Sequence, residues 1–225
     1  LEFLSYQDKF LAGSWRFNTY FGRDTLISAL LLAPVLEPAA AEAALSSVLD
    51  RLDAKGEVAH EEDIGEFAVL RNAREGRGRI ATPIYDYGMV DDDFLLAPFA
   101  ARWLLDDERG RARARAFLAA TGVERRPHGA ALVRNLVWMI ERTAAFAADP
   151  RARNLVGIKD GRTTGNWRDS EQGLGRGRFA YDVNAALVPA ALEAAARLHA
   201  SKMLDGYLDE SGHAALARAA SQARV

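Results

Sequence analysis

Cysteine is absent from the sequence, and its absence removes three kinds of chemistry at once. A chain without thiols forms no disulfide, has no thiolate nucleophile and offers no cysteine ligand to a metal ion. The compartment stays open, because many secreted bacterial proteins also lack cysteine.

The sequence also lacks a long apolar run and an excess of basic residues. No apolar stretch reaches the roughly 18 residues that suggest a membrane span, so no such helix is predicted. With 29 basic against 31 acidic side chains the formal net charge is -2, whereas nucleic-acid binding needs a basic surface. A neutral polar ligand such as a sugar is compatible with this balance. No secretion signal is visible, and because the first residue is Leu1 rather than Met, we expect the chain to start inside a longer gene product.

The residues that are present favour a single helical domain spanning residues 1–225. Hydrophobic side chains make up 49% of the chain, enough for a substantial core, and they recur with helical spacing. No stretch of useful length alternates as a strand does, so the predicted fold class is all-α. Helices are predicted over residues 25–36, 38–54, 62–75, 92–106, 108–121, 128–148, 182–200 and 212–224.

The predicted loops are of two kinds. Short connections carry little beyond charge and turn residues, whereas four longer loops are rich in aromatics, Gly, Arg, Asp, Asn and His. These rich loops are residues 13–24, 56–63, 76–93 and 150–184, and each is predicted to enter a helix at its N-terminal end. In a toroid of paired helices such loops share one face and precede the inner helices, so distant residues converge on one pocket. The alternative is that long loops merely collect polar residues, although loops often carry function.

The first rich loop contains Trp15 and ends in the adjacent pair Arg23 and Asp24. A guanidinium beside a carboxylate gives fixed donors and acceptors for vicinal hydroxyls, through charge-assisted hydrogen bonds. Neighbouring aromatic side chains can stack on the apolar face of a pyranose. The alternative is that Asp24 is a helix N-cap beside an incidental arginine.

The second loop contains His60 and Glu61, followed by two more acidic residues. Three interpretations are open. A metal site is disfavoured by the spacing, because adjacent side chains on a helix do not face each other. The acidic residues fit the first turn of a helix, where the helix dipole stabilises them. Alternatively, His60 and Glu61 reach a sugar.

The third loop contains Tyr85 and Asp86 and ends in the three aspartates Asp91, Asp92 and Asp93. Tyrosine and aspartate together make a plausible wall for a polar ligand, with Asp91 or Asp92 facing the pocket. The alternative is that the aspartates cap a helix and do nothing more.

The fourth loop brings together Trp167, Arg168 and Asp169, and leads to Asn184. A carboxyl beside an indole is partly desolvated, which raises its pKa. A general acid needs a raised pKa to hold its proton near neutrality, so Asp169 is the predicted general acid. The alternative is a structural aspartate in a Gly-rich loop.

Five segments, in order along the chain, resemble one group of enzymes. Residues 21–25 (FGRDT) resemble the signature in the glucosidase domain of glycogen debranching enzymes, and related Arg-Asp pairs occur in glucoamylase-like enzymes. Residues 58–61 are similar to a segment of processing glucosidases and mannosylglycerate hydrolases, and residues 85–91 resemble a Tyr…Val-Asp segment of the family. Residues 166–169 resemble the debranching-enzyme segment whose aspartate is the acid, and residues 181–185 are similar to the segment that follows it, with Tyr-Asp replacing Val-Glu.

This resemblance covers residues 15–198 and implies an (α/α)6 toroid that hydrolyses α-glucosidic bonds of oligo- or polysaccharides with inversion. No cofactor or metal is needed for that reaction. Asp169 would be the general acid, and substrate contacts would come from Trp15, Arg23, Asp24, His60, Glu61, Tyr85, Asp86, Asp91, Trp167, Arg168 and Asn184.

An inverting enzyme also needs a base carboxylate across the sugar ring from the acid. In the family this glutamate lies near the C-terminal end of the toroid. A complete toroid also has more helices than the eight predicted here. We therefore expect the chain to be part of a toroid, with the base beyond Val225.

The main alternative is a non-catalytic carbohydrate-binding or scaffold protein on the same helical frame, which would keep the sugar pocket and lack the base. A toroidal epimerase or lyase would use histidine chemistry. This is disfavoured, because only four histidines are present and His60 alone lies in a motif. The expected partner is an oligosaccharide or polysaccharide, with neither nucleic acid nor membrane.

Overall fold

The computed structural model describes residues 5–6, 9–10, 12, 19–123, 125–167, 169–178 and 183–225, and at residues 5, 6, 9 and 169 it describes the backbone only. Of the described residues, 57% lie in helices and 7% in strands, so the chain is mostly helical, as the sequence predicts. None of the described strands joins a sheet of more than two strands. In the same ranges, no helix combines the length and apolarity needed to cross a bilayer.

The α-helices are α1 (Gly22–Leu32), α2 (Pro38–Leu49), α3 (Gly65–Arg74), α4 (Leu96–Ala101), α5 (Glu108–Ala119), α6 (His128–Ala148), α7 (Asn184–Ala200), α8 (Glu210–Ala217) and α9 (Ala219–Gln222). Shorter helical turns are the 3-10 turns η2 (Asp91–Phe94), η4 (Ala152–Asn154) and η5 (Asp205–Tyr207), and the π-turn η3 (Arg102–Asp106). The described strands form antiparallel pairs: β1 (Ser5–Tyr6) with β2 (Lys9–Phe10), β3 (Glu61–Asp63) with β4 (Ile84–Asp86), and β5 (Thr164–Asn166) with β6 (Asp169–Ser170).

The ends of the helices follow local chemistry. α2 begins at Pro38, because a proline in the first turn loses no helical hydrogen bond, and it continues through alanines that favour helix. Asp107 caps α5, since its carboxylate accepts the Arg109 backbone N–H at 2.9 Å. α6 ends before Pro150, because a proline holds the residue ahead of it in an extended conformation.

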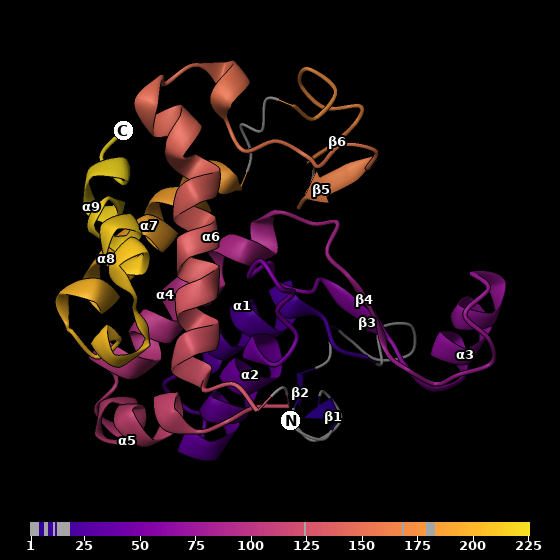
Figure 1. Ribbon diagram of the computed structural model, residues 1–225, viewed down its shortest axis with the longest axis horizontal. Coiled ribbons are helices and arrows are strands. Elements are labelled where there is room, and N and C mark those ends of the chain that lie inside the picture. The colour runs from indigo at the N-terminus through magenta and orange to yellow at the C-terminus, as the bar shows by residue number, and fades with distance from the viewer. Residues whose placement is uncertain are drawn as a thin grey trace.

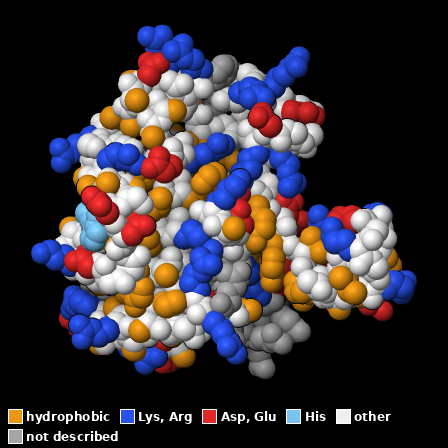
Figure 2. Space-filling model, in the orientation of Figure 1, with side chains coloured by type: hydrophobic (Ala, Val, Ile, Leu, Met, Phe, Trp, Pro, Cys, Tyr) orange, Lys and Arg blue, Asp and Glu red, His pale blue; other side chains and the backbone are white. Residues whose placement is uncertain are grey.

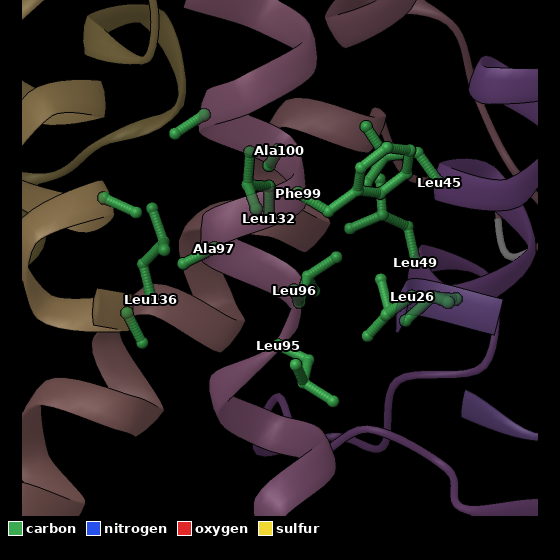
Figure 3. Packing of buried hydrophobic residues seen from close by; sticks show 14 of the residues in the cluster. Leu26, Leu45, Leu49, Leu95, Leu96, Ala97, Phe99, Ala100, Leu132 and Leu136 are labelled. Carbon is green, nitrogen blue, oxygen red and sulfur yellow. The ribbon is translucent and has the colours of Figure 1, made fainter. Parts of the chain in front are cut away.

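The buried core is centred on α4. This short helix packs against α1, α2, α6 and α7, and all of its residues except Pro98 are buried (Figure 1). In Figure 3, Leu96 and Phe99 of α4 lie among Leu26 of α1 and Leu45 of α2. The remaining buried residues of α4 are alanines, whose small side chains let the neighbouring helices approach closely.

The helices that follow three of the rich loops lie next to one another. α1, α4 and α7 come after the loops that end near residues 22, 91 and 184, and α4 contacts both α1 and α7. The turn η2, which precedes α4, also contacts α1 and α7. The N-terminal ends of these three helices therefore lie near one another. The helix α3, which follows the second rich loop, does not join them, so the predicted alternation holds for three of the four loops only. A closed ring of paired helices, the (α/α)6 toroid, belongs to the proposal made below.

Several predicted helix bounds are wrong. The helix predicted over residues 38–54 ends at Leu49, and the helix predicted over residues 212–224 is divided into α8 and α9. The helix predicted over residues 62–75 begins only at Gly65, because residues 61–63 form β3 and give their backbone groups to β4. Gly65 has a φ of 58°, a left-handed conformation that glycine adopts readily. The helix predicted over residues 92–106 is divided into η2, α4 and η3. Pro98 has no N–H to bond back to the Phe94 carbonyl, which fits its place in the first turn of α4, where that bond is not needed.

The helix α3 stands apart from the helical body. It is carried by the strands β3 and β4, and Figures 1 and 2 show this arm projecting to one side. Phe67 and Leu70 on α3 are largely exposed. The base of the arm is fixed to the body by His60, whose backbone carbonyl accepts the N–H of Gly22 in α1 at 2.8 Å.

Candidate functional site

Asp91 is the residue at which three distant segments meet. It is fully buried in η2, and its Oδ2 accepts a hydrogen bond from Arg23 Nη1 at 3.1 Å, within a salt bridge. The same oxygen accepts the backbone N–H of Trp167 at 2.9 Å. One carboxylate therefore joins the first turn of α1, the turn η2 and the loop between β5 and β6.

Arg23 and Trp167 together offer a charged donor beside an aromatic face. The side chain of Arg23 is 18% exposed, and its guanidinium carbon lies 5.9 Å from the ring centre of Trp167. Trp167 itself is 47% exposed. A pyranose presents an apolar face and a rim of hydroxyls, so this pairing suits a sugar: the indole stacks and the guanidinium donates hydrogen bonds.

A second buried carboxylate, Asp92, orients His60. The Nδ1 atom of His60 lies 2.9 Å from Asp92 Oδ2, and the imidazole meets the Phe21 ring edge-on at 5.5 Å between centres. The backbone of His60 is also fixed, because its carbonyl accepts the Gly22 N–H at 2.8 Å. With Nδ1 committed to Asp92, Nε2 is the nitrogen left to contact a ligand.

The pKa values of His60 and Asp92 are both raised, for different reasons. Burial raises the pKa of Asp92 to about 6, although the hydrogen bond and charge of His60 oppose the change. Burial lowers the pKa of His60, but the hydrogen bond and charge of Asp92 more than offset it, so the net shift is upward. Each member of the pair therefore keeps its proton to a higher pH than it would when free in water.

The third aspartate, Asp93, points into the protein interior. Its Oδ1 accepts the Val58 backbone N–H at 2.6 Å and its Oδ2 accepts the Trp138 indole N–H at 3.3 Å. Burial raises the pKa of Asp93 to about 7, while the nearby Lys159 charge and these hydrogen bonds lower it. A 3-10 turn has three residues per turn, so three successive side chains leave it in different directions. This explains why neighbouring aspartates have different partners.

The loop that carries the predicted acid is tied to the body at several points. The Val90 N–H donates to the Gly165 carbonyl at 2.5 Å, next to the contact between Trp167 and Asp91. Asn184, buried at the start of α7, donates from Nδ2 to Asn166 Oδ1 at 2.6 Å. These bonds fix β5 against both η2 and α7.

Three of the predicted site residues fall wholly or partly outside the described residues. Trp15 and Arg168 lie outside them. For Asp169 the backbone is described, and it pairs with Asn166 across β5 and β6. The Asp169 side chain lies outside the description, so its role as acid stays a prediction.

Two of the alternatives that the sequence left open are wrong. Asp24 is not the N-cap of α1, because the N-cap is Phe21 and Asp24 lies inside the first turn. Glu61 is not in the first turn of a helix, because it lies in β3 opposite Asp86. Asp86 forms a salt bridge with Arg162 at 2.9 Å, at the base of the arm.

Tyr85 lies against different partners from Trp167. Its ring contacts Tyr87 edge-on at 6.4 Å, and both tyrosines line a cavity of about 280 Å³ together with Arg51. Arg51 forms a salt bridge with the buried Glu62 at 2.7 Å. Of the residues around Asp91 described above, none lines this cavity.

The partners that hold the site residues are not predicted from the sequence. The sequence offers Asp92 only as an alternative to Asp91, whereas the structure pairs it with His60. Lys159, which forms a salt bridge with Glu57 at 2.6 Å, lies in no motif of the sequence. The run of three aspartates was a usable signal for buried acids, but no local pattern links Lys159 to a residue 102 positions away.

Within the described residues, no group of three or more His, Asp or Glu side chains is arranged to hold a metal ion. Comparison with known proteins finds no family, no curated protein and no solved structure that matches this chain. The chemical capacity of the site therefore rests on the geometry of its own residues.

Proposed function

We propose that this chain is part of an inverting glycoside hydrolase that acts on α-glucosidic bonds of oligo- or polysaccharides. The observation that carries the proposal is the convergence of Arg23, Asp91 and Trp167 from three segments far apart in sequence. The frame would be part of an (α/α)6 toroid in which α1, α4 and α7 are inner helices.

In this proposal the sugar lies against the exposed face of Trp167. Arg23, held in place by Asp91, donates to its hydroxyls, and charge-assisted bonds of this kind are about twice as strong as neutral ones. His60 adds a further polar contact through Nε2. Asp24, Glu61 and Asp86 would complete the polar rim of the site.

Asp169 supplies the proton in the proposed reaction. Its carboxylic acid protonates the glycosidic oxygen as the bond from that oxygen to the anomeric carbon breaks. Water attacks the anomeric carbon from the opposite face and loses a proton to a base carboxylate. A nearby indole raises the pKa of a carboxyl by excluding water, which suits the acid.

The proposal is tested with protein expressed from the complete reading frame. The assay follows glucose release from maltooligosaccharides or a branched dextrin, with calorimetry for binding. Asp169→Asn should lower the rate of hydrolysis by about 10²–10⁴-fold, because asparagine cannot deliver a proton. It should leave binding nearly intact, because asparagine keeps the shape of the side chain. Arg23→Ala should weaken binding and turnover together.

Asp160→Asn is the matched control, because Asp160 is a largely exposed carboxylate in the same loop. It should behave like the wild type. Near-normal turnover by Asp169→Asn would assign the acid to another residue. A wild-type protein that binds oligosaccharides but hydrolyses none would support a non-catalytic carbohydrate-binding protein instead.

A further inference from the structure

Lys159 occupies an unusual position for a lysine at the start of a surface loop. Its side chain is only 20% exposed, and its Nζ lies 2.6 Å from Oε1 of Glu57, which is 11% exposed. Nζ also donates to the backbone carbonyl of Tyr87. The charge of Lys159 further lowers the pKa of the buried Asp93. One ammonium group therefore binds the carboxylate of Glu57 and the carbonyl of Tyr87, and its charge stabilises the ionised form of Asp93.

Lys159 lies in a loop of residues 157–178, whose described residues pack against one another. The Ile158 N–H donates to the Gly177 carbonyl at 3.1 Å, which closes the two ends of the loop on each other. Within the loop, the Glu171 N–H donates to the Thr163 carbonyl at 2.7 Å. A Cβ added at Gly177 would lie 2.7 Å from the Ser170 carbonyl oxygen, so the loop is closely packed there. Because these contacts link the described parts of the loop, a contact that fixes Lys159 against the body also restrains the rest of the loop.

The other ion pairs of this loop are more exposed than that of Lys159. Arg178 and Asp160 pair at 2.8 Å, but their side chains are 67% and 87% exposed, and exposed pairs contribute little to stability. The Arg162 side chain, which pairs with Asp86, is about half exposed. Removing Lys159 has a larger consequence, because it leaves the buried carboxylate of Glu57 without the cation that it pairs with.

We propose that Lys159 is a positioning residue, which fixes the loop of residues 157–178 against the body and thereby holds Trp167 and Asp169 at the candidate site. Its effect on turnover rests on the proposed function, whereas its effect on the loop does not. Lys159 acts through the loop and touches no substrate. The hydrogen bonds from Val90 to Gly165 and from Trp167 to Asp91 report directly on whether the loop is in place.

The test compares Lys159→Met with Lys159→Arg and with Arg178→Met, a matched control that removes an exposed cation from the same loop. Hydrogen exchange is measured at the amides of Val90 and Trp167, with the amides of α4 as the reference for global unfolding. In Lys159→Met, exchange at the two reporter amides should rise about tenfold or more while exchange in α4 changes much less. Lys159→Arg keeps the charge and should restore most of the protection. Arg178→Met should match the wild type.

A parallel measurement follows hydrolysis by the same variants. Lys159→Met should lower kcat/KM by about 10- to 100-fold, because a small misplacement of a catalytic loop is enough for such a loss. Lys159→Arg should recover most of this activity. If the wild type shows no hydrolysis, the proposed function fails, but the exchange experiment still tests the role of Lys159.

Two outcomes would overturn the role of Lys159. The first is wild-type exchange at Val90 and Trp167 in Lys159→Met. The second is an equal rise in exchange at these amides and throughout α4, which would make Lys159 a determinant of global stability only. Should Lys159→Met fail to fold, Glu57→Gln weakens the same pair with a side chain of the same shape. It should raise exchange at the same two amides, and an absence of that rise would equally contradict the proposal.

Discussion

Replacing Asp91 with alanine would remove the carboxylate that joins three segments, and the structure sets the size of the expected effect. The variant loses the bonds from Arg23 at 3.1 Å and from the Trp167 N–H at 2.9 Å. A hydrogen bond to a charged group contributes about 1.5–3 kcal/mol, and breaking a buried ion pair costs about 3–5 kcal/mol. Arg23 is partly exposed, so water can solvate the charge left behind. We therefore expect Asp91→Ala to lower the free energy of unfolding by about 3 kcal/mol, the lower end of that range.

Asp91→Asn separates the charge from the shape. The asparagine oxygen can still accept both bonds, so we expect a loss of about 1–2 kcal/mol. Urea unfolding of wild type and both variants, followed by circular dichroism, measures these differences. The reasoning is refuted if Asp91→Ala unfolds at the wild-type urea concentration, or if Asp91→Asn is as unstable as Asp91→Ala.

Two further predictions concern the neighbouring aspartates. Raising the pKa of Asp93 from its ordinary 3.8 to about 7 means that the folded protein binds its proton more tightly than the unfolded chain does. Stability from this group is fully present below about pH 4 and is lost as the pH rises from there through 7, by at most about 4 kcal/mol in all and by roughly 3 kcal/mol above pH 5. Urea unfolding at pH 5 and pH 8 should show this loss in the wild type, and Asp93→Asn should reduce it; an equal loss in both proteins would assign it to other groups. The second prediction concerns the pair of His60 and Asp92. Asp92→Asn should lower the pKa of His60 in an NMR titration, because the carboxylate that raises this pKa is gone and burial, which lowers it, remains. An unchanged His60 pKa would mean that Asp92 does not set it.

The helices could be predicted from the sequence because their signals are local. Alanine-rich segments with apolar residues three and four positions apart predict α6 and the start of α2, and Pro38 and Pro150 indicate where α2 begins and where α6 ends. The start of α3 could not be predicted in this way. Pairing of β3 with β4 depends on residues some twenty positions further along the chain, and local preference for helix loses to it.

The candidate site is also predictable from the sequence only in part. The contact of Arg23 with Asp91 agrees with the prediction that the rich loops converge, since both residues stand at the start of packed helices. The partners that orient these residues were not predictable. Asp92 reaches His60 across 32 positions and Lys159 reaches Glu57 across 102, and both contacts depend on how the helices pack.

Time-resolved proton NMR of the sugar released from a maltooligosaccharide tests the central claim most directly. The claim is that the protein cleaves α-glucosidic bonds with inversion and that Asp169 supplies the proton. Protein expressed from the complete reading frame should release β-glucose first, with α-glucose appearing later by mutarotation, and Asp169→Asn should release neither. Release of α-glucose first, or no release from an oligosaccharide that the wild type binds, would contradict the claim.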